Sequence, residues 1–119
     1  MTRRLLVLAA ALLALGCAAG APIASVADLR GEWKGRVSNP MGQAPAALAV
    51  AENGDFKGVM FLDGGDRNFH GALIVVRPGQ VRYQGTDGNG TVRIAEENGR
   101  RVLRFLRDGG GVDAIFRQF

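Results

Sequence analysis

Few residues in this chain could carry out chemistry. It contains one histidine, His70, and one cysteine, Cys17, among 119 residues. Zinc sites and hydrolytic triads need several such ligands or catalytic partners together, and a single histidine cannot supply them. His70 alternates with Phe69 along an apolar segment, which predicts that it points outward as a plain surface side chain. We therefore expect no catalytic residue, no resident metal, no cofactor and no enzymatic activity.

The acidic and glycine-rich segments favour turns over ligand sites. The segment 87–91 (DGNGT) is similar to the start of a calcium loop, but Val92 stands where such a loop needs glycine and Asn98 where it needs glutamate. The segment 63–66 (DGGD) is typical of a tight turn with two solvated carboxylates. No glycine-rich segment is followed by the Gly-Lys-Ser/Thr of a phosphate loop.

A row of arginines is the one pattern above this background. A two-residue turn at 98–99 (NG) would place Arg93 opposite Arg104, with Arg82 diagonal to them on the neighbouring strand. Facing like charges are mildly destabilising, so such a row could serve anionic groups such as phosphates or acidic glycans. The alternative is an ordinary solvated face whose charge is relieved by Glu96 and Asp113.

The elements that position these side chains are short strands. Turn signals rich in Asn, Asp and Gly recur about every ten residues from Gly31 onward, with no helical segment between them. We expect an all-β fold, a single small antiparallel up-and-down barrel of about eight strands. Residues 25–28 (SVAD) predict one short helical turn that acts as a lid, and Trp33 is expected to plug the interior. The expected strands are 31–38, 45–52, 55–62, 67–76, 80–86, 91–97, 100–107 and 112–119.

Alternation along these strands predicts an inward face. A two-residue turn at 64–65 would pair inward residues 56, 58, 60 and 62 with 73, 71, 69 and 67. A three-residue loop at 77–79 then sets Val81 and Tyr83 opposite Val75 and Leu73. The inward face continues through 92, 94, 103 and 105. The run 73–76 (LIVV) is apolar on both sides, so its outer face is expected to be covered.

The N-terminus has the three parts of an export signal. Arg3 and Arg4 precede an apolar run of 11 residues, 5–15, which small residues follow. A stable anchor helix needs about 20 apolar residues, so this run is too short to remain in a bilayer. Loss of the signal leaves 13 basic and 11 acidic residues, a formal charge of +2 in place of +4. Because these charges are interspersed, we expect no nucleic-acid partner.

The segment 14–17 (ALGC) resembles a bacterial lipoprotein signal, in which the cysteine after a small residue is lipidated. It departs from the usual pattern at Ala14, where that family usually has leucine. The resemblance implies lipid attachment at Cys17, and Ala18 implies sorting to the outer membrane. The expected organisation is a signal peptide over 1–17, a tether and helical turn over 18–28 and a barrel over 29–119.

Residues 31–33 (GEW) resemble the G-x-W motif that opens the first strand of lipocalins and avidin-like barrels, and 49–58 is similar to the second avidin hairpin. The lipocalin resemblance implies that Arg117 packs over Trp33. The avidin ligand residues are largely absent, which argues against biotin. Residues 28–33 (DLRGEW) also resemble periplasmic β-barrel inhibitors of metalloproteases, although the usual disulfide of that family is missing.

These features predict an exported, lipid-anchored protein of the bacterial outer membrane that faces the periplasm. Its barrel would bind a small apolar ligand or an envelope protein without catalysis. The alternative is an inhibitor of an envelope or secreted hydrolase that acts through its N-terminal segment. Ligand binding requires an open apolar cavity beside Trp33, whereas inhibition requires a filled barrel and a mobile segment 18–28.

Overall fold

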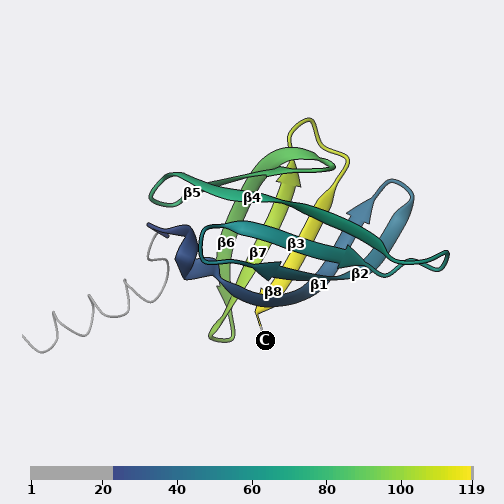
Figure 1. The fold of residues 1–119 in the computed structure, drawn as a ribbon, viewed down its shortest axis with the longest axis horizontal. Coiled ribbons are helices and arrows are strands. Elements are labelled where there is room, and N and C mark those ends of the chain that lie inside the picture. Colours follow the sequence, from purple (N-terminus) through teal and green to yellow (C-terminus); the bar gives the residue numbers. More distant parts are fainter. Residues whose placement is uncertain (1–22, 119) are drawn as a thin grey trace, which may run out of the picture.

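The computed structural model describes residues 23–118, which form a closed antiparallel barrel of eight strands in the order β1 to β8 (Figure 1). One 3-10 turn, η1 (Val26–Leu29), precedes the strands, and Ser25 caps it through its side-chain oxygen. This confirms the expected up-and-down barrel and its short N-terminal turn. The strands are β1 (Gly31–Asn39), β2 (Gly42–Val50), β3 (Asp55–Met60), β4 (Arg67–Arg77), β5 (Gln80–Gly85), β6 (Gly88–Glu97), β7 (Arg100–Arg107) and β8 (Asp113–Gln118).

Four strand limits differ from expectation by two residues or more, and one of them is the end of β2, at Val50 rather than at residue 52. β2 begins at Gly42, three residues early, because the first hairpin turn consists only of residues 40 and 41. β3 ends at Met60, and Phe61 and Leu62 belong to the loop that follows. β6 begins at Gly88, because the turn occupies Thr86 and Asp87 and the next glycines continue the strand.

The β3–β4 register is also corrected. Phe56 pairs with Gly71 and Met60 with Arg67, so β4 is displaced by two residues from the expected pairing. A displacement of two keeps the paired side chains of β3 and β4 on their predicted faces, because side chains alternate with a period of two. Leu62, which was expected to face inward, lies in the loop and is exposed. The other register predictions are confirmed: Val81 lies opposite Val75, and Arg93 lies opposite Arg104.

Aromatic rings fill the barrel by lying over glycines on neighbouring strands. Tyr83 pairs with Gly90, and a Cβ atom at Gly90 would stand 2.6 Å from the Tyr83 ring and 2.1 Å from the Leu106 carbonyl oxygen. Phe69 covers Gly58 in the same way, with its ring 2.1 Å from a Cβ atom built there. Inward glycine thus gives a small barrel room for large rings, as seen when aromatic side chains cover strand glycines elsewhere.

The two ends of the barrel are built differently. The hairpin loops alternate between the ends, and η1 lies at the end that also holds the β4–β5 tip (Figure 1). At this capped end Leu29 and Trp33 are fully buried. The opposite end, here called the open end, carries the β1–β2, β3–β4, β5–β6 and β7–β8 loops. All strands, the cap and the buried core lie within 23–118, so a chain that starts at Ala18 contains the whole barrel.

No helix in the described part of the chain is long and apolar enough to cross a membrane.

Candidate ligand-binding site

An apolar cavity of about 80 Å³ lies at the open end of the barrel. Its walls carry aromatic side chains that project inward from β3, β4, β5, β7 and β8, namely Phe56, Phe69, Tyr83, Phe105 and Phe116. Phe105 is central, with ring centroids 5.9 Å from Phe56, 5.1 Å from Tyr83 and 5.6 Å from Phe116. The contacts with Phe56 and Phe116 are edge-to-face, an arrangement that aromatic pairs favour. Aromatic rings that contact one another therefore line the cavity.

The position of this cavity corrects one expectation. Ligand binding was expected to require an open apolar cavity beside Trp33, but Trp33 belongs to the capped end and is fully buried. Its indole Nε1–H donates to the carbonyl oxygen of Leu29 at 3.0 Å. The apolar cavity is lined instead by residues near the other end of the same strand, such as Val37.

The cap is held by several backbone contacts. The carbonyl oxygen of Asp28 accepts a hydrogen bond from Nη1 of Arg101 at 2.6 Å. The carbonyl oxygen of Ile23 accepts one from the amide of Gly79, in the β4–β5 turn, at 3.2 Å. The inhibitor alternative requires a mobile segment 18–28, but residues 23–28 are docked against the barrel, and residues 18–22 lie outside the described part of the chain.

Arg117 does not pack over Trp33. Because Phe116 faces the core, Arg117 lies on the outer face of β8, where its Nη2 donates to Glu97 at 3.0 Å. It pairs with Lys34 and Val102 on the flanking strands rather than with Trp33. The position over Trp33 that the lipocalin resemblance implied for Arg117 is therefore wrong. At the cap, the contacts are made by Leu29 and Arg101 instead.

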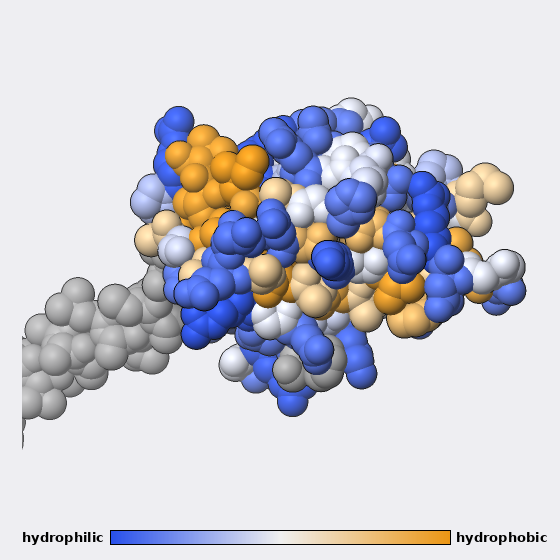
Figure 2. All heavy atoms as spheres, viewed as in Figure 1, coloured by the Kyte–Doolittle hydropathy of each residue, from blue (hydrophilic) through white to orange (hydrophobic). Residues whose placement is uncertain are grey.

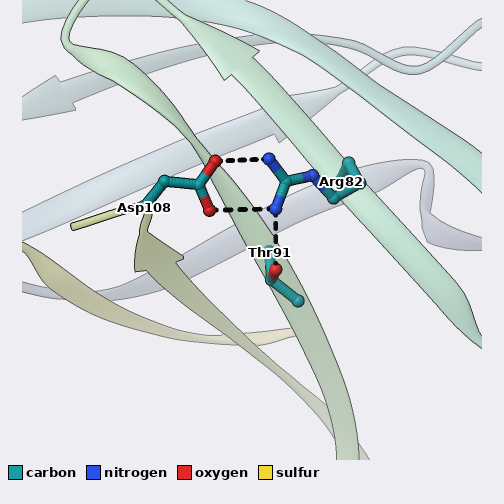
Figure 3. Close-up of polar contacts among 3 residues, drawn as sticks. All are labelled: Arg82, Thr91 and Asp108. Carbon is teal, nitrogen blue, oxygen red and sulfur yellow. Dashed lines mark hydrogen bonds and ion pairs between the residues drawn. The ribbon is translucent and has the colours of Figure 1, made fainter. Parts of the chain in front are cut away.

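The predicted arginine row exists, but carboxylates neutralise most of it. Figure 3 shows the Arg82 guanidinium facing both carboxylate oxygens of Asp108, with Nη1 also 3.0 Å from the Thr91 hydroxyl oxygen. The hydrogen bond from Arg82 lowers the pKa of the Asp108 carboxyl below its usual range. Arg104 binds Asp113 through Nε at 3.2 Å and Nη2 at 2.7 Å.

Arg93 is the exception in this row. Within 23–118 it makes no ion pair. Asp113 neutralises part of the row, as the alternative of an ordinary solvated face expected. The second carboxylate comes from Asp108 rather than from Glu96. The geometry thus leaves one free guanidinium of three for an anion, and an anion-binding role of this face stays a prediction.

Glycines at the mouth of the cavity make room for a cation that the sequence reasoning missed. Arg107 follows Leu103 and Phe105 at the inward spacing of β7, and it lines the cavity. A Cβ atom at Gly88 would lie 2.8 Å from the Arg107 Nε, so this glycine leaves room for the side chain in its present position. Extending the predicted inward series from 103 and 105 to 107 would have found it.

The other polar groups at the mouth are divided between paired and free. Asp87 accepts a hydrogen bond from Nη2 of Arg67 at 2.7 Å. The Tyr83 hydroxyl and the Arg107 guanidinium make no side-chain hydrogen bond with residues 23–118. Burial raises the pKa of the Tyr83 phenol, and the nearby Arg107 charge lowers it in part, so the phenol is neutral near pH 7.

The remaining predicted features have simple outcomes. His70 is exposed and borders the mouth, as an outward histidine should. No three metal-ligating side chains come together among residues 23–118. Cys17, the expected lipidation site, lies outside the described residues.

An apolar patch covers part of the outer surface over the β4–β5 hairpin (Figure 2). Ile74 and Val76 of β4 are 40% and 56% exposed there. Covering of the outer side of the 73–76 run was expected, but these two residues are open to solvent in the described part of the chain.

Comparison with protein-family models, with curated proteins and with solved structures found no match.

Proposed function

We propose that this chain is a lipid-anchored, non-enzymatic protein of the bacterial cell envelope whose barrel binds a small apolar ligand through its open end. The observation that carries the proposal is the aromatic cavity of about 80 Å³. Pockets that enclose drug-sized molecules measure roughly 300–1,000 Å³. A cavity of about 80 Å³ is well below this range. The ligand is therefore small, or it inserts only the tip of a longer chain.

The position of the N-terminal segment supports an accessible mouth. The described chain begins at Ile23, which is hydrogen-bonded to the β4–β5 turn at the capped end. Five residues separate Cys17 from Ile23, and the six steps between them span at most about 20 Å when fully extended. A lipid on Cys17 would hold the capped end near the membrane and leave the open end facing the aqueous periplasm.

Binding is tested with 1-hexanol, a neutral probe whose chain tip fits the cavity, added to the ¹⁵N-labelled chain from Ala18. We expect saturable chemical-shift changes around the open end. The variant Val112→Phe, which enlarges a residue that lines the cavity, should abolish them. The matched variant Ile115→Phe, on the outer face of β8, should bind as the wild type does. Equal binding by both variants would place the probe elsewhere and refute the site.

Anchoring is tested separately by expressing the full chain in a Gram-negative bacterium. The mature protein should fractionate with membranes and carry a mass increment that fits an acylated N-terminal cysteine. Cys17→Ser should lose both properties. A wild-type protein that is soluble, or one cleaved at another residue, would refute the anchor without affecting the ligand site.

A further inference from the structure

The mouth of the cavity carries one guanidinium, that of Arg107, without an ion-pair partner among residues 23–118. Of its charged lining residues, Asp87 is already paired with Arg67, at 2.7 Å. Arg107 is exposed and has no ion pair within 23–118. Asp108, the next residue along the chain, is held by Arg82 on the outer face. Among the described residues, no carboxylate therefore neutralises Arg107 at the mouth.

The loop 61–66 at the same end contains two further carboxylates, Asp63 and Asp66. Both are exposed, and neither lines the cavity or makes an ion pair with a described residue. They contribute a general negative field that water and salt screen, rather than a partner for the guanidinium.

A second free donor lies deeper in the same site. Tyr83 is only 9% exposed, yet its hydroxyl makes no hydrogen bond with residues 23–118. Buried tyrosines usually find a partner for that group. No buried side-chain oxygen or nitrogen in this part of the chain is both sealed from solvent and unpartnered, so the Tyr83 hydroxyl is accessible to solvent, and Tyr83 lines the cavity. A neutral phenol at this position can donate to an anionic acceptor.

The local backbone leaves room for both donors. Gly88 and Gly90 occupy the two inward positions of β6 next to them. Any larger side chain at Gly88 would displace the Arg107 guanidinium, and one at Gly90 would collide with the Tyr83 ring. The two glycines thus leave room for the Arg107 side chain and for the Tyr83 ring, both of which line the aromatic cavity.

We propose that the site selects amphiphilic anions, with a short apolar tail among the aromatic rings and a carboxylate held by Arg107 and Tyr83. This inference rests on the proposed ligand-binding function and specifies its ligand class. Guanidinium groups bind carboxylates with charge-assisted, often bidentate hydrogen bonds, which neutral alcohols cannot match.

The test compares three probes of equal chain length, hexanoate, 1-hexanol and hexylammonium, by NMR titration of the chain from Ala18 at pH 7. Hexanoate should bind about tenfold or more tightly than hexanol, the ratio expected for one hydrogen bond to a charged group, and hexylammonium more weakly than either. Arg107→Gln should remove the preference for hexanoate, so that hexanoate binds this variant no more tightly than hexanol does. Arg100→Gln, at an exposed arginine beside the β6–β7 turn of the capped end, should retain the preference.

The outcomes separate the two proposals. If hexanol binds at the open end as tightly as hexanoate, or if the preference survives in Arg107→Gln, ligand binding stands and anion selection is wrong. If none of the three probes binds, the proposed function itself fails, and this inference fails with it. Amide shifts of Arg107→Gln that are dispersed as in the wild-type spectrum would show that the variant is folded.

Discussion

The two ends of the barrel should lose different amounts of folding stability when one hydrogen-bonding side-chain group is removed. In Trp33→Phe, the Leu29 carbonyl oxygen loses its indole donor, 3.0 Å away, in a region where both side chains are fully buried. A buried acceptor without a partner costs about 1–3 kcal/mol. The smaller ring also gives up roughly 40 Å² of buried apolar surface, or about 1 kcal/mol. We expect the free energy of unfolding to fall by about 2–4 kcal/mol.

The matched control is Tyr83→Phe at the open end. Its hydroxyl has no partner among residues 23–118, so its removal should change the free energy of unfolding by less than about 0.5 kcal/mol. Both variants are measured by urea unfolding followed by far-ultraviolet circular dichroism, because Trp33→Phe lacks the fluorophore. A loss below about 1 kcal/mol in Trp33→Phe, or a larger loss in Tyr83→Phe, would refute the description of a sealed end and an open one.

Three further predictions, made with four substitutions, concern the packing and the outer face. Gly90→Ala should lower the free energy of unfolding by about 2 kcal/mol or more in thermal unfolding, since its Cβ atom has no space, while Gly64→Ala, in open surroundings, should be nearly neutral. Asp108→Asn should destabilise the protein at pH 7. Folding lowers the pKa of Asp108, so the stability that its carboxylate contributes is present above the unfolded pKa of about 4 and is lost as the pH falls through the folded pKa. The difference in the free energy of unfolding between Asp108→Asn and the wild type should therefore narrow in acid. Arg117→Ala should leave the emission maximum of Trp33 unchanged, because the two side chains lie on opposite faces.

Each of these has a clear contrary result. Equal stability of the two glycine variants would show that the barrel interior can expand. A stability difference for Asp108→Asn that is independent of pH would show that the ion pair is not its cause. A red shift of the Trp33 emission in Arg117→Ala would show that Arg117 does cover the indole.

Turn chemistry made part of the fold predictable. Asn98 and Gly99 both have positive φ, 52° and 77°, as a two-residue hairpin turn requires. This fixes the β6–β7 register, and with it the opposition of Arg93 and Arg104. Alternation was equally informative, because it assigned faces correctly even where the β3–β4 pairing was displaced by two residues.

The candidate site was less accessible to sequence reasoning. Glycine serves two different physical needs, and its position in a sequence does not distinguish them. Gly90 was assigned to a turn, but it lies in β6, where the absence of a Cβ atom makes room for the Tyr83 ring. With Gly88 and Gly90 in a turn, the open end could not be placed, and Arg107 was not connected to it.

Alternation along the strands also could not predict the partners of the charged side chains. Asp108 reaches Arg82 across β6, a contact that depends on the β7–β8 loop conformation rather than on strand spacing. Arg117 was placed by analogy with another family, although its neighbour Phe116 already occupied the inward position. Local alternation was the better guide at that point.

The central claim is that a small apolar molecule enters the barrel at its open end. The most direct measurement is of intermolecular nuclear Overhauser effects between the methyl end of 1-hexanol and the side chains of the chain from Ala18. We predict contacts with the rings of Phe56, Tyr83 and Phe105, which line the cavity. Contacts confined to the exposed Ile74 and Val76, or none at saturating probe, would contradict the account.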